Sequence, residues 1–204
     1  MPLSREEGHL AVELAREAIE CYVTGKRVPP RELESGLFHQ PRGVFVTLNS
    51  FTQGANNLRG CIGFPYPVKR LSDAIQEAAV AAASEDPRFP PVREEELDSV
   101  LVEVSILTPP QDFHVPRREI PSHIRIGQDG LLISRSYASG LLLPQVATEF
   151  GMDQLEFLSQ ACTKAGLPLD AWLDPSTRVQ VFQAEIFAER DPRGKVAKLS
   201  HEAP

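Results

Sequence analysis

Residues 43–64 read GVFVTLNSFTQGANNLRGCIGF, and this stretch decides the class of fold. Residues 43–50 are rich in the β-branched and aromatic side chains that are typical of strands, and LRGCIGF at 58–64 is a second strand-like run. The polar stretch FTQGANN separates the two runs and contains a glycine, which predicts a β-hairpin. The sheet therefore begins with neighbouring antiparallel strands.

Helices are expected on both sides of this hairpin. Ser4 and Glu7 have the spacing of a capping box, and Gly25 ends the helix that they begin. The segment 67–84 repeats apolar residues at helical spacing, and the prolines of EDPRFPPV end that helix. The expected buried positions of the two helices are Ala11, Leu14, Ala15, Ala18, Ile19, Tyr22, Leu71, Ala74, Ile75, Ala78, Ala79 and Ala82.

The remaining strands and helices do not alternate regularly. A strand is expected at 100–107, a hairpin with Asp129-Gly130 at its turn within 124–134, and a last strand at 179–189. Pro144 begins one helix, and Asp153 with Glu156 caps another, whose expected buried residues are Leu155, Leu158, Ala161, Cys162 and Ala165. This order predicts an α+β fold with a mainly antiparallel sheet and flanking helices.

Length and composition limit the number of domains. The 204 residues correspond to about 1.4 domains of typical size, which predicts either one large domain or two small lobes. We expect one domain over residues 1–189, with a seam near the proline-rich link 108–122. Residues 190–204 are expected to form a polar, frayed tail.

Charge and cysteine content narrow the class of function. The net charge of −7 argues against a broad nucleic-acid surface, although a small anion site needs only local donors. Three widely spaced cysteines form neither a disulfide framework nor a zinc motif, and no other metal-ligand spacing is present. The N-terminus has no apolar signal core, and no apolar run approaches membrane-spanning length, so a cytoplasmic location is expected.

The motif LRGCIG at 58–63 is the first candidate site. Strict alternation would place Arg59 and Cys61 on one face, where the guanidinium would favour the nucleophilic thiolate or hold an anionic substrate. Gly60 and Gly63 would let a ligand approach the backbone, whose N–H groups would serve as donors. The alternative is that Cys61 is a small buried apolar residue and that the glycines relieve a tight bend.

The motif DPRFPP at 86–91 is the second candidate site. Asp86 and Arg88 can pair with each other in a rigid polar turn that presents Asp86 as a base or Arg88 as an anion anchor. The alternative is a helix stop with a surface ion pair.

Other reactive side chains are less informative. The five histidines make no ligand pattern, and any of them could act as a base for Cys61 in the folded chain: His9, His39, His114, His123 and His201. Cys21, Cys162 and Trp172 are expected in the core.

Several blocks in this order resemble the AMMECR family, which is named for the AMME-syndrome chromosomal region. They are LRGCIG, DPRFPP, EVSIL at 103–107, LLLPQVATEFG at 141–151, KAGL at 164–167 and Trp172. The likeness extends from the first helix to about residue 189. Met152 departs from the family, which tends to have tryptophan after the preceding glycine.

The resemblance implies two unequal α+β lobes, with LRGCIG lining a cleft between them, and Asp86 and Arg88 near that cleft. It also implies partners of the Memo-like and radical SAM classes, but it brings no established activity and leaves the cofactor unknown. Three hypotheses follow. The first is an enzyme, or a component of one, that uses Cys61 on a small, anionic substrate. The second is a non-catalytic adaptor, and the third, least favoured by charge, is a nucleic-acid binder.

Overall fold

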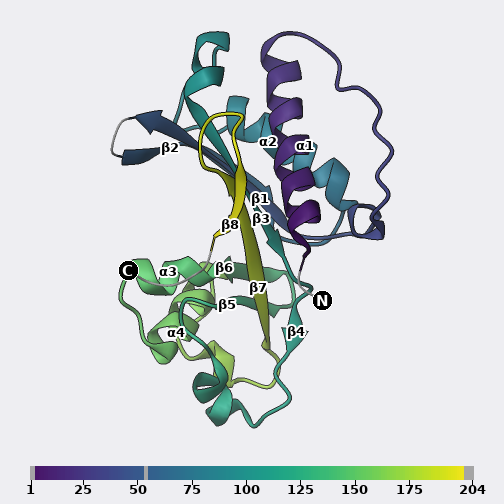
Figure 1. Ribbon diagram of the computed structural model, residues 1–204. Helices are drawn as coiled ribbons and strands as arrows, with labels where there is room; N and C mark the ends of the chain where they lie inside the picture. Colours follow the sequence, from purple (N-terminus) through teal and green to yellow (C-terminus); the bar gives the residue numbers. More distant parts are fainter. Residues whose placement is uncertain (1–2, 53–54, 200–204) are drawn as a thin grey trace. The chain divides into compact units, whose positions relative to one another are not determined.

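The computed structural model describes residues 3–52 and 55–199 (Figure 1). The chain divides into two compact units. Unit 1 holds the residues up to Leu107 together with Glu185–Leu199, and unit 2 holds Thr108–Ala184. No helix within the described ranges is both long and apolar enough to cross a membrane.

Unit 1 consists of two helices packed on one face of an antiparallel sheet. Strand β1 lies between β2 and β3, and Val46 is opposite Ile62 on one side and Val104 on the other. The described elements of unit 1 are α1 (Arg5–Val23), the 3₁₀ helix η1 (Gly36–His39), β1 (Val44–Thr52), β2 (Ala55–Phe64), α2 (Leu71–Ser84), the 3₁₀ helix η2 (Glu94–Ser99), β3 (Val100–Leu107), the end of β7 (Arg178–Glu189) and β8 (Val196–Leu199).

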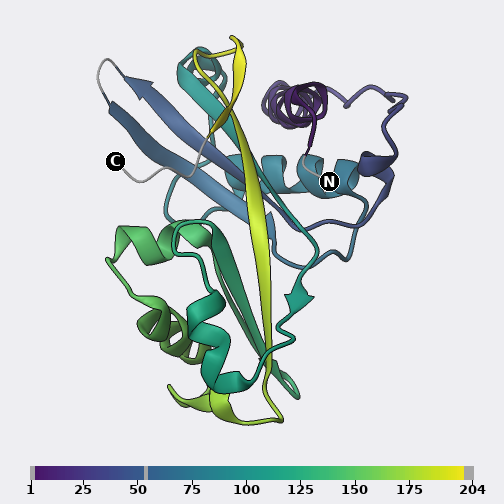
Figure 2. The same ribbon diagram turned by 60° about the horizontal axis from the view of Figure 1, so that its bottom comes forward.

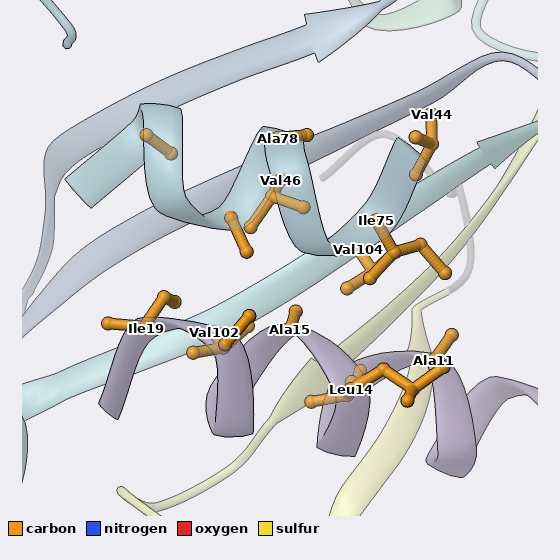
Figure 3. Packing of buried hydrophobic residues seen from close by; sticks show 14 of the residues in the cluster. Ala11, Leu14, Ala15, Ile19, Val44, Val46, Ile75, Ala78, Val102 and Val104 are labelled. Carbon is orange, nitrogen blue, oxygen red and sulfur yellow. The ribbon is translucent and has the colours of Figure 1, made fainter. Parts of the chain in front are cut away.

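The two helices cross over the same apolar side of this sheet. Figure 2 shows α1 almost end-on while α2 runs across the view, so the two helices are not parallel. In Figure 3, Val46 and Val104 point toward these helices, and Ala15 and Ile75 point back from them. Because strand side chains alternate between faces, the residues between the buried valines lie on the opposite face of the sheet.

A buried ion pair joins distant parts of unit 1. Arg16 of α1 donates through Nε to Glu189 of β7 at 3.0 Å, and a second guanidinium nitrogen completes a bidentate pair. Arg16 also donates to the carbonyl oxygens of Leu97 and Val100, and Glu189 accepts the N–H of Val102. The satisfied polar groups explain how two charged residues remain in the interior.

Unit 2 is a smaller antiparallel sheet covered by α4. Strand β5 lies between β6 and β7, and Phe157 and Leu158 of α4 belong to the core. The described elements are β4 (Gln111–Asp112), η3 (Arg117–His123), β5 (Asp129–Arg135), β6 (Ala138–Leu142), α3 (Pro144–Glu149), α4 (Gln154–Lys164), η4 (Ala171–Leu173) and β7 (Arg178–Glu189), whose end belongs to unit 1.

The α+β class and the mainly antiparallel sheet are confirmed, and so are the capping boxes at Ser4 and Asp153. The predicted stripes are buried apart from Tyr22 and Leu155, which are 48% and 52% exposed. Both lie at the margin of a helical stripe, where spacing alone does not decide burial.

The predicted hairpin turn at Asp129-Gly130 is wrong, because these residues begin β5 and the chain reverses between Arg135 and Ala138. The Asp129 carboxylate instead accepts the backbone N–H of Arg125 and ion-pairs with its guanidinium, which holds the preceding loop.

Two further expectations need correction. Part of the predicted frayed tail, Val196–Leu199, forms β8 and pairs with the end of β7, while residues 200–204 lie outside the described residues. The predicted loop 51–57 is largely strand, and its residues 53–54 also lie outside the described ranges.

Candidate functional site

The LRGCIG motif lies in β2, at the edge of the unit 1 sheet. Cys61 is opposite Thr47 of β1. The Cys61 N–H points away from β1 and donates to Oδ2 of Asp86 at 2.8 Å. The edge of the strand is therefore closed at this point by a side chain from the segment after α2, which brings the two sequence motifs together.

Asp86 and Arg88 pair as the sequence predicts. Oδ1 of Asp86 accepts the backbone N–H of Arg88 at 3.1 Å and its Nε at 2.9 Å, and Oδ2 accepts Nη2 at 2.7 Å. Asp86 is only 4% exposed, whereas the Arg88 side chain is 52% exposed. These hydrogen bonds thus make the turn after α2 rigid, and its Asp86 carboxylate contacts the Cys61 backbone.

This pairing sets the protonation of both groups. The Arg88 guanidinium holds the pKa of Asp86 far below its usual range, and Asp86 raises the pKa of Arg88. A carboxylate that is ionised and saturated with donors is a poor proton acceptor at neutral pH. The hypothesis that Asp86 acts as a base is therefore not supported, and its contacts make it an anchor for the strand.

Arg59 is also engaged by a carboxylate. It donates to Glu96 of η2 through Nε at 2.8 Å and Nη2 at 3.0 Å, and to the carbonyl oxygen of Pro90 at 2.9 Å. This pairing lowers the pKa of Glu96. The guanidinium carbons of Arg59 and Arg88 lie 5.9 and 5.5 Å from the centre of the Phe89 ring, within cation–π range.

Arg59 and Cys61 do not follow the strict alternation that predicts a shared face. The register shifts between Leu48 and Asn49, so Arg59 is an extra residue without a partner in β1. Such a bulge re-aims a side chain, here toward Glu96. The Arg59 side chain is 12% exposed, and its predicted action on the Cys61 thiol stays a prediction.

The chain itself fills the space beside Gly60 and Gly63. A methyl group added at Gly60 would lie 2.1 Å from the carbonyl oxygen of Ala82, and one at Gly63 would lie 2.4 Å from that of Val44. The prediction that these glycines leave room for a ligand is thus corrected to close packing of β2 against α2 and β1. Of the predicted backbone donors, the Cys61 N–H is already occupied by Asp86.

The Cys61 side chain has partners that sequence reasoning missed. The Thr47 hydroxyl lies 3.4 Å from Sγ and donates to it. Thr47 is also opposite Glu103 of β3, so the three side chains form a row across the sheet, on the face opposite the core. A single charged residue in the apolar run VLVEVSIL was the available signal for Glu103.

The structure also places other histidines, cysteines and the tryptophan that the sequence singled out. In unit 1, His9 lies by Glu13, and His39 contacts the carbonyl oxygen of Leu33, while His201 lies outside the described residues. Cys162 and Trp172 are buried as expected, but Cys21 is only half-buried. Within residues 3–52 and 55–199, no group of three or more His, Cys, Asp and Glu could hold a metal ion.

The fold and the site define an α+β protein in which the turn Asp86-Pro87-Arg88 holds the edge strand that contains Cys61. The chain belongs to the AMMECR1 family, whose model matches residues 12–187. A protein from Thermococcus gammatolerans is 54% identical over 196 residues, 95% of each chain. One from Methanothermobacter thermautotrophicus is 56% identical over 191 residues, 92% of this chain and 97% of that one.

A crystal structure shares the fold. It is that of an uncharacterised protein from Pyrococcus horikoshii, which superposes with a TM-score of 0.82 at 48% identity and covers 97% of this chain and 98% of its own. The family resemblance of the sequence motifs is thereby confirmed.

Proposed function

We propose that the chain is an enzyme, or a component of one, that uses the Cys61 thiol as a nucleophile or covalent anchor for a small molecule. The observation that carries the proposal is the hydrogen bond from Thr47 to Cys61 Sγ on a half-buried face of the sheet. This contact holds the sulfur in a fixed position, which a nucleophile requires. The clamp of Asp86 and Arg88 on the Cys61 backbone supports the proposal, because it limits movement of the nucleophile.

The nature of the substrate follows from which cation is accessible. Arg59 is enclosed by Glu96 and the Pro90 carbonyl, whereas half of the Arg88 side chain is exposed. An anionic group on a small substrate would therefore meet Arg88 rather than Arg59. We place the protein in the cytoplasm, a proposal supported by its three free cysteines.

Site-resolved labelling with iodoacetamide tests the role of the thiol. In the native protein at neutral pH, Cys61 is expected to react at least about tenfold faster than Cys21, which is also half-buried, because of its Thr47 donor. Cys162 is the buried control and should react only on unfolding, since burial raises the pKa of its thiol. Thr47→Val should slow the labelling of Cys61 alone.

If Cys61 is labelled no faster than Cys21, the proposed role of Cys61 as a nucleophile is wrong. Mass spectrometry after tryptic digestion assigns each modified residue in one experiment. Because Cys21 and Cys162 report on the same sample, global unfolding cannot imitate the expected result.

A non-catalytic adaptor is the second candidate function. It is favoured by the mutual pairing of Arg59 with Glu96 and Arg88 with Asp86, which leaves the charged groups in structural contacts. The partners proposed from the family resemblance are Memo-like and radical SAM proteins. Pull-down with the Cys61→Ser variant tests this role. Normal partner binding together with full pathway flux would favour the adaptor, and loss of flux with intact binding would favour thiol chemistry.

A further inference from the structure

Three polar side chains lie side by side on the face of the unit 1 sheet that carries no helix of that unit's core. Thr47 is directly opposite Cys61 in β2 and directly opposite Glu103 in β3. Their neighbours Val46 and Val104 point to the core (Figure 3). Directly opposed residues in antiparallel strands are about 4.5–5.5 Å apart between Cα atoms, so Cys61 and Glu103 flank Thr47 at about 10 Å from each other.

Glu103 differs from three other half-buried or buried carboxylates of unit 1. Asp86, Glu96 and Glu189 each pair with an arginine. Within the described part of the chain, the carboxyl group of Glu103 has no ion pair or side-chain hydrogen bond. Burial raises the pKa of Glu103, so this carboxyl keeps its proton to a higher pH than an ordinary glutamate. Unpaired, half-buried carboxyl groups cost stability and are typical of sites with a chemical role.

We propose that Glu103 is the general acid of the Cys61 site and that the substrates are small acyl compounds, such as esters or thioesters, bound over Thr47. This proposal rests on the proposed thiol function. Cys61 and Glu103 lie on either side of Thr47, so a carbonyl group bound over the Thr47 side chain would have the sulfur on one side and the carboxyl on the other.

The step balances without a cofactor. Cys61 first loses its proton to water. The thiolate then forms a C–S bond to the carbonyl carbon, and the bond to the leaving atom breaks as Glu103 gives its proton to that atom. The products are an acyl-Cys61 thioester and a neutral alcohol or thiol, and Glu103 takes a proton back from water. Thr47 is a positioning residue, since it holds the sulfur through its hydroxyl.

Three probes with different demands for a proton test the role of Glu103. Phenyl acetate releases a basic phenolate that needs an acid, p-nitrophenyl acetate releases a weakly basic one, and iodoacetamide releases iodide, which needs none. For Glu103→Gln we expect a loss of about 100-fold in the acylation rate with phenyl acetate, a much smaller loss with p-nitrophenyl acetate, and no loss in alkylation. Glu95→Gln, an exposed carboxyl outside the row, is the matched control and should leave all three rates unchanged.

The outcomes separate the two proposals. Equal rates of Glu103→Gln and wild type with phenyl acetate, alongside rapid alkylation of Cys61, would overturn the role of Glu103 and leave the thiol function standing. Failure of Cys61 to react with any probe would overturn both. Glu103→Asp keeps the acid on a shorter side chain and should recover part of the phenyl acetate rate. A variant that merely disturbs the sheet would instead slow the three probes alike.

Discussion

At the scale of single residues, Asp86 shows how one side chain can unite two motifs. Its carboxylate receives the N–H of Cys61, the N–H of Arg88 and the Arg88 guanidinium. Arg59 and Glu96 form a second, separate pair nearby. These contacts assign Asp86, Arg59 and Glu96 to structure, whereas Cys61, Thr47, Glu103 and the exposed part of Arg88 are the groups on which the proposed chemistry depends.

Asp86→Asn should lower stability at neutral pH by about 1–3 kcal/mol, an amount limited by the exposure of Arg88. The lowered pKa of Asp86 means that its contribution is present above the unfolded value of about 3.9 and is lost as the pH falls toward the folded value. Urea unfolding between pH 7 and pH 3 should therefore show a shallower acid dependence for the variant. Parallel curves would contradict this linkage.

Glu103→Gln should have the opposite effect on stability. Because burial raises the folded pKa of Glu103, the group ionises more readily in the unfolded chain, so it destabilises the fold as the pH rises above the unfolded value, and the penalty is absent below that value. The variant should thus be more stable than wild type at neutral pH and equally stable at about pH 4. Denaturant midpoints at the two pH values provide the check, and a neutral-pH loss would argue for a hidden stabilising contact.

At the scale of elements, the glycines of β2 decide how closely strand and helix approach. Gly60 faces α2, where the carbonyl oxygen of Ala82 occupies the place of a side chain. The bulge at Arg59 then turns the strand so that its arginine meets η2 while Cys61 remains opposite Thr47. Packing of α2 therefore fixes the position of the site.

Gly60→Ala should lower the free energy of unfolding by about 3 kcal/mol. The added methyl group would lie 2.1 Å from a backbone oxygen that cannot move independently. Gly36→Ala is the matched control, since a methyl group there meets nothing within 4 Å. It should remain within about 1 kcal/mol of wild type. Thermal and urea unfolding of the two variants measure the difference, and equal stability would disprove the close approach.

At the scale of the whole molecule, chain ends far apart in sequence meet inside unit 1. Arg16 and Glu189 are 173 residues apart and are joined by a buried ion pair. The chain thus leaves unit 1 after Leu107 and returns at Glu185 to complete it. The stability of unit 1 consequently depends on residues that follow unit 2 in the sequence.

Arg16→Ala should destabilise the protein by about 3–5 kcal/mol, because Glu189 would remain buried without its cation. Combining Arg16→Met with Glu189→Leu should cost less than the sum of the two single variants, since neither charge is then left alone. A double-mutant cycle from urea unfolding measures this coupling. Additive losses would show that the pair contributes no more than its separate side chains.

The net charge of −7 is a property of the whole molecule. We expect no salt-sensitive binding to duplex or single-stranded nucleic acid, because counterion release needs clustered cations. Fluorescence anisotropy across a salt series measures this directly. Affinity that falls steeply with salt would revive the nucleic-acid hypothesis.

Local patterns in the sequence determined the elements of this protein. Capping boxes at Ser4 and Asp153, the apolar periodicity of 67–84 and the apolar run of 100–107 each depend on neighbours a few residues apart. Together with LRGCIG they also identified the family. The turn after Arg135 escaped prediction because Asp129-Gly130 has the same local signature as a hairpin turn.

Only the tertiary structure decided which side chains form the site. Asp86 follows Cys61 by 25 residues, and their contact depends on how α2 packs on β2. The row of Cys61, Thr47 and Glu103 depends on the register of three strands, which a shift of one residue would reverse. The spacing of residues along the sequence does not indicate which residues of neighbouring strands pair. The motifs that contain Cys61, Asp86 and Arg88 are therefore readable in the sequence, but the geometry of the proposed site arises from the packing of distant segments.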